Sequence, residues 1–456
     1  MSVLPVIAVF DIGRTNKKCF LFDEQYHIVW EQSVELAETE DEDGFPCEDI
    51  DALTAWVKKT MIEVLSLEGF SVKAVNFSAH GASFVYINEQ GQPVGHLYNY
   101  LKPYPVALQK KFYTTYGGEQ AFSLATASPV LGSLNSGLQV YRLQKEKPEL
   151  YEQVQYALHL PQYISYLITG KPCAEITSIG CHTGLWHFSQ RQYHEWVYEE
   201  ALDEKFPSVL RSDAVLETAA PLGKIKAGVG LHDSSAALVP YLASFTEPFV
   251  LLSTGTWCIS LNPFNTEPLT AAELEQDCLS YLSYQRQTVK ASRLFAGQEH
   301  EIQVKRLAEH FAVTEDYYRQ VDYNKSLLEK VGTASKKEPV YTGSHPSAFG
   351  ERDLEGFASY EEAYHQLISD IMQQQQLAIS LILSSHPPTR IFVDGGFARN
   401  AVFMHMLAAG FPAMKVYAAA VSQASALGAA LVLHAAWNTQ PLRRDLVALT
   451  AYSSGS

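Results

Sequence analysis

The strongest constraint on the fold is a strand–turn–strand pattern near the start of the chain. In residues 8–24 (AVFDIGRTNKKCFLFDE) an apolar run ends at Asp11, a turn containing Gly13 follows, and a second apolar run begins after three cations. Together with a third apolar run over residues 27–36, this pattern predicts an antiparallel meander of strands. The carboxylate of Asp11 should emerge where its strand ends.

The turn after Asp11 has the residue types of a metal–phosphate site. It combines a glycine, two side chains that donate hydrogen bonds, and three cations: Gly13, Thr15, Asn16, Arg14, Lys17 and Lys18. Successive backbone N–H groups of such a turn can point at an anion. Mg²⁺ prefers one or two carboxylates plus phosphate oxygens and water, which suits Asp11. An ordinary hairpin turn is the alternative.

A similar pattern returns half a chain later. Residues 249–261 (FVLLSTGTWCISL) are again two apolar runs around a turn of small residues, and Gly255 and Thr256 could donate hydrogen bonds to a phosphate. Another hairpin turn is the alternative. The repetition indicates two similar halves with a boundary near residues 240–246, so we expect domains over residues 1–240 and 241–456.

Helical and strand patterns alternate in the rest of the chain. A helix is predicted over residues 51–67, capped by Asp49 or Asp51, then two strands around Gly81. Residues 148–170 show helical spacing up to Gly170. The C-terminal part predicts a helix over 360–386 ended by prolines, strands over 390–396 and 414–418, and helices over 400–410 and 422–437. This alternation is typical of an α/β fold with sheets covered by helices.

Two further stretches could carry chemistry. In residues 392–400 (FVDGGFARN), Gly395 and Gly396 allow a flat ligand to approach the backbone, and a helix N-terminus follows near Asn400. A tightly packed strand–helix turn is the alternative. In residues 228–240 (GVGLHDSSAALVP), Asp233 could act as a general base, or cap the helix that follows, or do both.

Composition excludes several classes of partner. The formal net charge is −16, whereas nucleic acids and anionic membranes attract basic surfaces. No run approaches the roughly 18 apolar residues of a membrane span, and the N-terminus lacks the basic start of a signal peptide. The six cysteines are scattered without a C-x-x-C pair, so we expect reduced thiols rather than disulfides or a zinc site. A cytoplasmic protein is predicted.

The order of these stretches is more specific than any one of them. An acid–glycine turn, Gly-x-x-Asp, Ser-Thr-Gly-Thr and Asp-Gly-Gly follow one another over about residues 6–437. This order resembles the FGGY family of carbohydrate kinases, within the actin- and hexokinase-like ATPase superfamily. The resemblance implies an α/β protein of two ribonuclease H-like domains around a cleft, with the sugar on the first domain and ATP on the second.

The resemblance also implies roles for single residues. Asp11 would hold Mg²⁺, and Asp233 would take the proton from the attacking sugar hydroxyl. The residues expected to contact ATP are Gly13, Arg14, Thr15, Asn16, Gly255, Thr256, Gly395, Gly396 and Asn400. The residues expected to contact the sugar are His80, Gly81, Asn99, His232 and Asp233. His80 could equally be a satisfied histidine between two strands, and Arg14 could point to solvent.

The chain departs from the family pattern at three places. Residues 98–105 lack the Asp and Arg of many relatives, so Asn99, Tyr100 or Lys102 would take over. Arg14 replaces a small residue, and Gln162 replaces an Asp. These departures favour a side branch that acts on ketoses such as L-fuculose or L-rhamnulose.

Three functions stay open at this point. The first is an ATP-dependent sugar kinase, the second an actin- or chaperone-type nucleotide switch, and the third a sensor that binds sugar without transfer. The base in GLHD favours the kinase, because a nucleotide switch does not need it. A homodimer is left open as the assembly.

Overall fold

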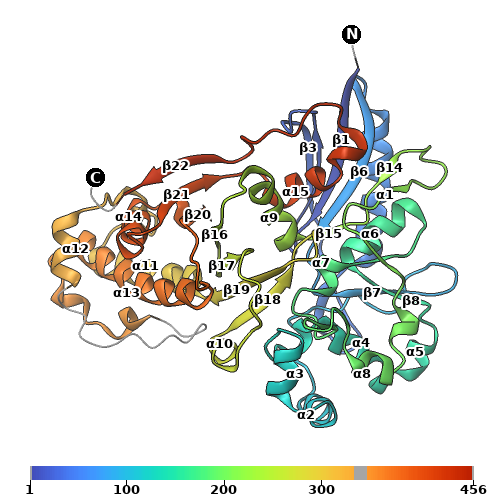
Figure 1. Cartoon of the computed structure of the whole chain (residues 1–456), viewed down its shortest axis with the longest axis horizontal. Coiled ribbons are helices and arrows are strands. Elements are labelled where there is room, and N and C mark those ends of the chain that lie inside the picture. Colours follow the sequence, from blue (N-terminus) through green and yellow to red (C-terminus); the bar gives the residue numbers. More distant parts are fainter. Residues whose placement is uncertain (1–2, 333–346, 454–456) are drawn as a thin grey trace. The chain divides into compact units, whose positions relative to one another are not determined.

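The computed structural model describes residues 3–332 and 347–453, which form two compact α/β units (Figure 1). Unit 1 comprises Met1–Ser244, Ser280–Gln287 and Ser422–Leu446. Unit 2 comprises Phe245–Leu279, Thr288–Val421 and Val447–Ser456. The division into domains over residues 1–240 and 241–456 stays a prediction.

A mixed sheet forms the centre of unit 1, with strand order β13-β14-β6-β1-β2-β3 and β15 paired to β6. Its strands are β1 (Leu4–Ile12), β2 (Asn16–Phe22), β3 (Ile28–Glu35), β6 (Phe70–Ala79), β13 (Leu216–Glu217), β14 (Lys226–Ala227) and β15 (Leu231–His232). The first three pair antiparallel, which confirms the predicted meander. Strands β1, β14 and β15 each run parallel to β6.

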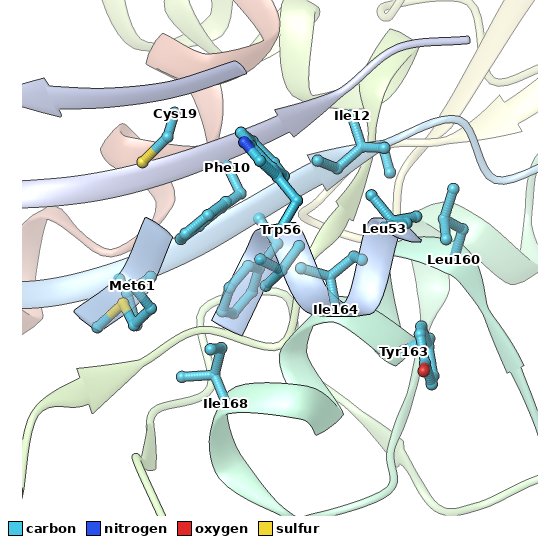
Figure 2. Packing of buried hydrophobic residues seen from close by; sticks show 14 of the residues in the cluster. Phe10, Ile12, Cys19, Leu53, Trp56, Met61, Leu160, Tyr163, Ile164 and Ile168 are labelled. Carbon is cyan, nitrogen blue, oxygen red and sulfur yellow. The ribbon is translucent and has the colours of Figure 1, made fainter. Parts of the chain in front are cut away.

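Helices α1 (Ile50–Ser66) and α6 (Leu160–Thr169) bury their apolar residues in one core with the sheet of unit 1. Figure 2 shows Phe10 of the sheet beside Trp56 of α1, and their ring centroids are 5.7 Å apart in an edge-to-face arrangement. Asp49 caps α1, since its carboxylate accepts a hydrogen bond from the N–H of Ala52 at 2.9 Å. The predicted helix over 51–67 and its cap at Asp49 are therefore confirmed.

The helical pattern over residues 148–170 is only partly correct. It divides into α5 (Pro148–Glu152), the strand β8 (Tyr156–His159) and α6, which ends at Gly170 in the left-handed conformation. Strand β8 pairs antiparallel with β7 (Phe84–Ile87), and this pairing overrides the helical spacing.

The remaining elements of unit 1 are short strands and helices. The strands are β4 (Glu38–Glu40), β5 (Pro46–Glu48), β9 (Ala174–Glu175), β10 (Trp186–His187), β11 (Gln192–Tyr193) and β12 (Val209–Leu210). The helices are α2 (Val106–Thr115), α3 (Glu119–Ala125), α4 (Ser136–Glu146), α7 (Ile176–Ile179), α8 (Glu195–Glu199), α9 (Asp233–Ser244), α15 (Ala424–Val432) and α16 (His434–Trp437).

The sheet of unit 2 has strand order β18-β19-β17-β16-β20-β21-β22. Its strands are β16 (Phe249–Thr254), β17 (Cys258–Asn262), β18 (Cys278–Leu282), β19 (Thr288–Leu294), β20 (Arg390–Gly395), β21 (Lys415–Ala420) and β22 (Ala448–Tyr452). Strands β16, β17 and β19 pair antiparallel, while β20 runs parallel to β16. This is the arrangement of β1, β2, β3 and β6, so the predicted similarity of the two halves is confirmed.

The helices of unit 2 follow the predicted alternation. They are α10 (Ala271–Glu275), α11 (Ala296–Phe311), α12 (Lys325–Gly332), α13 (Tyr360–Leu381) and α14 (Ala401–Gly410). Helix α13 ends at Leu381, before the two prolines that were expected to end it. In unit 1 the helix predicted over 422–437 is divided into α15 and α16.

Helices α9 and α15 of unit 1 lie side by side (Figure 1) and approach closely at Gly428. A Cβ atom at this position would lie 1.8 Å from the carbonyl oxygen of Ala236. The contact seats α15 against the helix that begins at Asp233.

We predict that Gly428→Ala destabilises the protein, although alanine is the better helix former by about 1 kcal/mol. Overpacking against a backbone atom typically costs about 1–3 kcal/mol, so the thermal midpoint should fall by roughly 2–6 °C. Gly356→Ala is the matched control, because no atom lies within 4 Å of its added Cβ. A rise in the midpoint for Gly428→Ala would contradict the close packing.

Candidate active site

Two carboxylates emerge at the same edge of the sheet in unit 1. Ser78 of β6 is the register partner of Asp11 on one side and of Leu231 on the other. Both neighbouring strands run parallel to β6, so they end at the same edge, where open α/β sheets bind ligands. Asp11 lies at the end of β1, and Asp233 directly follows β15.

The carboxyl group of Asp11 is half-buried and interacts electrostatically with the carboxylate of Asp233. Its Oδ2 accepts a hydrogen bond from the hydroxyl of Ser425 at 3.0 Å. Burial, with a smaller contribution from the negative charge of Asp233, raises the pKa of Asp11 to about 6 against the lowering effect of the Ser425 hydrogen bond. Two carboxylates and a hydroxyl are hard oxygen donors, which fit Mg²⁺.

The loop before Asp233 needs glycine at two positions. A Cβ at Gly228 would lie 2.1 Å from Oδ1 of Asn76, and one at Gly230 would lie 2.5 Å from the carbonyl oxygen of Pro161. Gly230 also has a φ of +81°, which glycine adopts without strain. Gln162 donates a hydrogen bond to the carbonyl of Gly230 at 3.0 Å. The Gln that departs from the family pattern therefore supports the loop of Asp233.

A buried carboxylate holds the last residue of β15. Glu175 accepts hydrogen bonds from the hydroxyl of Thr177 at 2.5 Å and from its backbone N–H at 2.8 Å. The backbone N–H of His232 donates in turn to the hydroxyl oxygen of Thr177 at 3.0 Å. Burial raises the pKa of Glu175 despite these hydrogen bonds. This chain of contacts fixes the backbone next to Asp233.

Asp233 is the first residue of α9. Its Oδ1 accepts a hydrogen bond from the N–H of Ser234 at 2.6 Å, which is the N–H of the next residue rather than one two or three positions on. Its side chain is 36% exposed, so a substrate can reach the carboxylate.

A small polar pocket lies in the same unit. It is lined by Arg14, Glu38, Glu48, His80, Ser83, Leu97, Tyr98, Asn99 and Tyr100. It thus brings together His80 and Asn99, which were expected to bind sugar, and Arg14, which was expected to bind ATP. Burial raises the pKa of Tyr100, while the charge of Arg14 lowers it and the charge of Asp233 adds to the rise.

Gly81 and His232 meet beside this pocket. A Cβ at Gly81 would lie 2.4 Å from Cδ2 of His232, so only glycine allows the imidazole to sit there. His232 is 5% exposed, and burial lowers its pKa, which keeps the ring neutral.

A buried ion network forms the floor of the pocket. Glu48 binds the ammonium group of Lys17 at 2.7 Å and Nε2 of His80 at 2.7 Å. Burial by itself would raise the pKa of Glu48, but the hydrogen bond and charge of His80 and the charge of Lys17 together lower it. His80 therefore combines the two roles left open by the sequence, since it is satisfied by a partner and also lines the pocket.

Two of the three cations of the first turn lie near acidic side chains within unit 1. Lys17 is 2% exposed and pairs with Glu48. The guanidinium of Arg14 lies 3.6 Å from Glu38 and 5.9 Å from the ring centroid of Tyr100. The three cations were expected to set a local positive field at this turn. This expectation is wrong for Lys17, because its charge faces the interior. Gly13 closes the turn by donating its N–H to the carbonyl of Asn16 at 3.0 Å, and Thr15 and Asn16 are exposed.

Two more residues of the sequence-predicted sugar site are engaged within the fold. The ammonium group of Lys102 binds Asp41 at 2.5 Å and Asp43 at 2.6 Å. The amide of Asn99 donates to the carbonyl of Pro46 at 2.9 Å. Tyr100, the third replacement considered for the missing Asp and Arg, has Arg14 and His80 as neighbours in the pocket.

In unit 2 the turn over residues 253–257 lies beside the Gly395–Gly396 pair. The N–H of Gly255 donates to the carbonyl of Trp257 at 2.9 Å, which leaves Gly255 and Thr256 exposed at the tip. Thr254 and Gly395 are register partners, and a Cβ at Gly395 would lie 1.9 Å from the carbonyl oxygen of Thr254. This contact requires glycine, which has a φ of +81° here.

Family models match nearly the whole chain. The model of the FGGY family of carbohydrate kinases, N-terminal domain, matches residues 6–239. The model of carbohydrate kinase FGGY, C-terminal domain, matches residues 246–441. The chain belongs to the FGGY family of carbohydrate kinases. The family phosphorylates sugars with ATP, so the protein is an ATP-dependent carbohydrate kinase.

Solved structures of related fold include three kinases. A carbohydrate kinase from Novosphingobium aromaticivorans has a TM-score of 0.81 at 22% identity, covering 99% of this chain and 95% of that one. A xylulose kinase from Lactobacillus acidophilus has a TM-score of 0.80 at 16% identity, covering 99% and 94%. A glycerol kinase from Plasmodium falciparum, solved with ADP, has a TM-score of 0.73 at 12% identity, covering 100% and 95%. At these identities the likeness shows the two-domain actin-like fold.

The side chain of Asn400 in this FGGY kinase has structural partners. Its Oδ1 accepts from the N–H of Phe403 at 3.0 Å and so caps α14, and its Nδ2 donates to the hydroxyl of Tyr364 at 2.7 Å. Tyr364 also contacts His300 at 2.9 Å, and burial lowers the pKa of His300 to about 4. An adenosine contact by Asn400 would add to these roles.

Sequence reasoning missed three side chains that hold the kinase's site together: Glu175, Thr177 and Ser425. Thr254 was identified as part of a hydroxyl-rich turn, but its partners within the fold were not. The hydroxyl of Thr254 donates to the carbonyl of Asp394 and accepts from the N–H of Phe397 at 3.0 Å. Ser and Thr residues in short turns give no distinctive spacing, so their long-range partners were not readable.

Within the described residues, no helix of the kinase is long and apolar enough to cross a membrane.

We predict that Glu48→Gln destabilises the kinase by about 3 kcal/mol near neutral pH, because it leaves the buried charge of Lys17 unpaired. The lowered pKa of Glu48 means that its stabilisation is present above its unfolded pKa and is lost as the pH falls through the folded value. The stability difference between wild type and variant should therefore shrink below about pH 4.5, the ordinary value for Glu.

The measurement is urea unfolding of both proteins at several pH values. Glu63→Gln is the matched control, since Glu63 forms only an exposed ion pair with Lys59. A stability difference that stays constant from pH 7 to pH 3 would contradict the assignment.

Proposed function

We propose that Asp233 is the general base of sugar phosphorylation and that the acceptor is a small ketose or related polyol, such as L-fuculose or L-rhamnulose. The observation that carries this proposal is the position of Asp11 and Asp233 at the carboxyl ends of β1 and β15 on either side of β6. A polar pocket containing His80 and Tyr100 lies in the same unit.

The surroundings of Asp233 support its role as the base. The N-terminus of α9 stabilises negative charge, and the partial exposure of the carboxylate gives a hydroxyl access to it. Asp233 would accept the proton of a sugar hydroxyl while the hydroxyl oxygen bonds to the γ-phosphorus of ATP. The bond from this phosphorus to the bridging oxygen breaks, and ADP leaves. A general base typically contributes about 10²–10⁴ in rate.

On the nucleotide side, Asp11 would hold Mg²⁺, which when bound neutralises charge on the phosphates. The backbone of Gly13 and the exposed side chains of Thr15 and Asn16 would donate to the terminal phosphate. In unit 2, Gly255 and Thr256 would bind the β- and γ-phosphates. Gly395, Gly396 and Asn400 would line the adenosine pocket.

On the sugar side, the pocket offers acceptors and donors in fixed positions. His80 is held by Glu48, and Tyr100 lies 5.6 Å from the His80 ring. We assign the side chain of Arg14 to this pocket, since its guanidinium lies between Glu38 and Tyr100, while its backbone remains part of the phosphate turn.

The acceptor is tested by coupled ADP release with L-fuculose, L-rhamnulose, D-xylulose, gluconate and glycerol. We expect the two deoxy-ketohexoses to give the highest kcat/KM. A higher kcat/KM for gluconate or glycerol would reject the ketose assignment. Sugar-independent turnover would favour a nucleotide switch, and sugar binding without turnover would favour a sensor.

We predict that Asp233→Asn lowers kcat by about 10²–10⁴ while it leaves folding and sugar binding intact, because the amide keeps the shape but cannot accept the proton. The measurement combines kcat with the best sugar, a thermal midpoint and sugar affinity by calorimetry. Asp51→Asn, an exposed acid in the first turn of α1, is the matched control and should keep wild-type turnover. Wild-type turnover in Asp233→Asn would show that Asp233 is not the general base.

A further inference from the structure

A cluster of metal-ligating side chains lies next to the candidate base in unit 1. The ligand atoms of Cys181, His182 and His232 all lie within 4.8 Å of one another. Cys181 and His182 follow α7, and His232 ends β15, and Figure 1 shows these two elements next to each other. Cys181 is 1% exposed and His232 is 5% exposed, while His182 is half-buried and gives the cluster a route to solvent.

One thiol and two imidazoles form a donor set that suits a zinc-type ion rather than Mg²⁺. Zinc binds imidazole nitrogen at about 2.0 Å and thiolate sulfur at about 2.3 Å, so tetrahedral ligand atoms lie roughly 3.5 Å apart. The distances between the ligand atoms, up to 4.8 Å, would shorten by up to about 1.3 Å on binding. Three protein ligands would leave a fourth position open, as in zinc sites that exchange a ligand.

The surroundings of His182 prepare it as a ligand. Its Nδ1 lies 3.2 Å from the carbonyl oxygen of Leu134, and since a carbonyl can only accept, Nδ1 carries the proton and Nε2 keeps its lone pair. Metal-binding histidines commonly donate their other N–H in this way. The backbone of His182 has a φ of +42°, which is unusual for a residue other than glycine, and Asn135 holds its carbonyl at 2.8 Å.

The surroundings of His232 link the cluster to the base. Nδ1 of His232 lies 3.3 Å from Oδ1 of Asp233, which is the pattern of a carboxylate that orients a metal-binding imidazole. The N–H of Ser234 lies closer to that carboxylate oxygen, at 2.6 Å, than to Nδ1, at 3.2 Å. The N–H of Ser234 thus contacts both atoms, and Nδ1 accepts from it in this structure. A ligand bond from Nε2 would place the ring proton on Nδ1, where it would be donated to Asp233 instead.

We propose that Cys181, His182 and His232 bind one zinc-type ion and that the bound ion inhibits phosphoryl transfer. An ion on Nε2 would fix the Nδ1 proton of His232 against the carboxylate that must receive the sugar proton. It would also tie the loop after α7 to the loop of Asp233. The inhibitory part rests on the proposed function of Asp233, whereas the binding part does not depend on it.

The binding part is tested with Co²⁺ as a spectroscopic substitute for Zn²⁺ on the full chain, without nucleotide or sugar. We expect one Co²⁺ per chain, with a near-ultraviolet thiolate-to-metal absorption that Zn²⁺ displaces. Cys181→Ser should lose this absorption, and both Cys181→Ser and His182→Ala should bind Co²⁺ at least tenfold more weakly. Cys173→Ser is the matched control, since this cysteine is equally buried but lies outside the cluster.

The binding part is overturned if wild type binds no stoichiometric Co²⁺, or if His182→Ala and Cys181→Ser bind it as wild type does. His182 is half-buried, so His182→Ala decides the result where thermal melting shows that Cys181→Ser does not fold.

The inhibitory part is tested by titrating Zn²⁺ into the coupled assay at saturating Mg-ATP. The Zn²⁺ concentration for half inhibition should rise at least tenfold in His182→Ala. Stoichiometric binding with unchanged turnover would overturn the inhibitory part. An error in the proposed role of Asp233 would instead appear as normal turnover in Asp233→Asn, with Co²⁺ binding intact.

Discussion

The parallel pairing of β1 and β15 with β6 is the constraint on which the site depends. Because Ser78 is the register partner of both Asp11 and Leu231, the pairing fixes where the two acids leave the sheet. Burial, and to a smaller extent the charge of Asp233, raises the pKa of Asp11, and such a group favours a bound cation. The loop of Asp233 is held on its other side by Gln162, Thr177 and the buried carboxylate of Glu175. The fold therefore holds two like charges close together at some electrostatic cost.

Close backbone contacts at glycines also hold the segments around the candidate site in place. At Gly228, Gly395 and Gly428 the backbone approaches another atom so closely that a Cβ could not be placed. Each contact fixes a segment that carries or supports a candidate site residue. Charge is treated in a similar way, because Lys17 is neutralised by Glu48 inside unit 1 and Arg14 lies near Glu38. The turn after β1 consequently exposes the polar side chains of Thr15 and Asn16, whereas Lys17 is buried.

Much of the fold was readable from the sequence, because the meander, the two similar halves and the alternation of helices and strands are set by local patterns. The strand at Tyr156–His159 could not be predicted, because its pairing with β7 overrides a helical spacing of apolar residues. Asp11, His80, Gly81, His232 and Asp233 were identified as candidates, and the structure brings them to one region of unit 1. Lys17 and Lys102 form ion pairs with acids far away in the sequence, Glu48 and Asp41. Local sequence patterns cannot reveal such partners. The cluster of Cys181, His182 and His232 was missed for the same reason, since the scattered cysteines showed no metal-ligand spacing.

The most direct test of the account is a crystal structure of the kinase with its preferred sugar bound. The account predicts one sugar hydroxyl within hydrogen-bond distance of the Asp233 carboxylate, at about 2.6–3.2 Å, with the ring against His80 and Tyr100. A sugar bound elsewhere in unit 1, with no hydroxyl near Asp233, would contradict it.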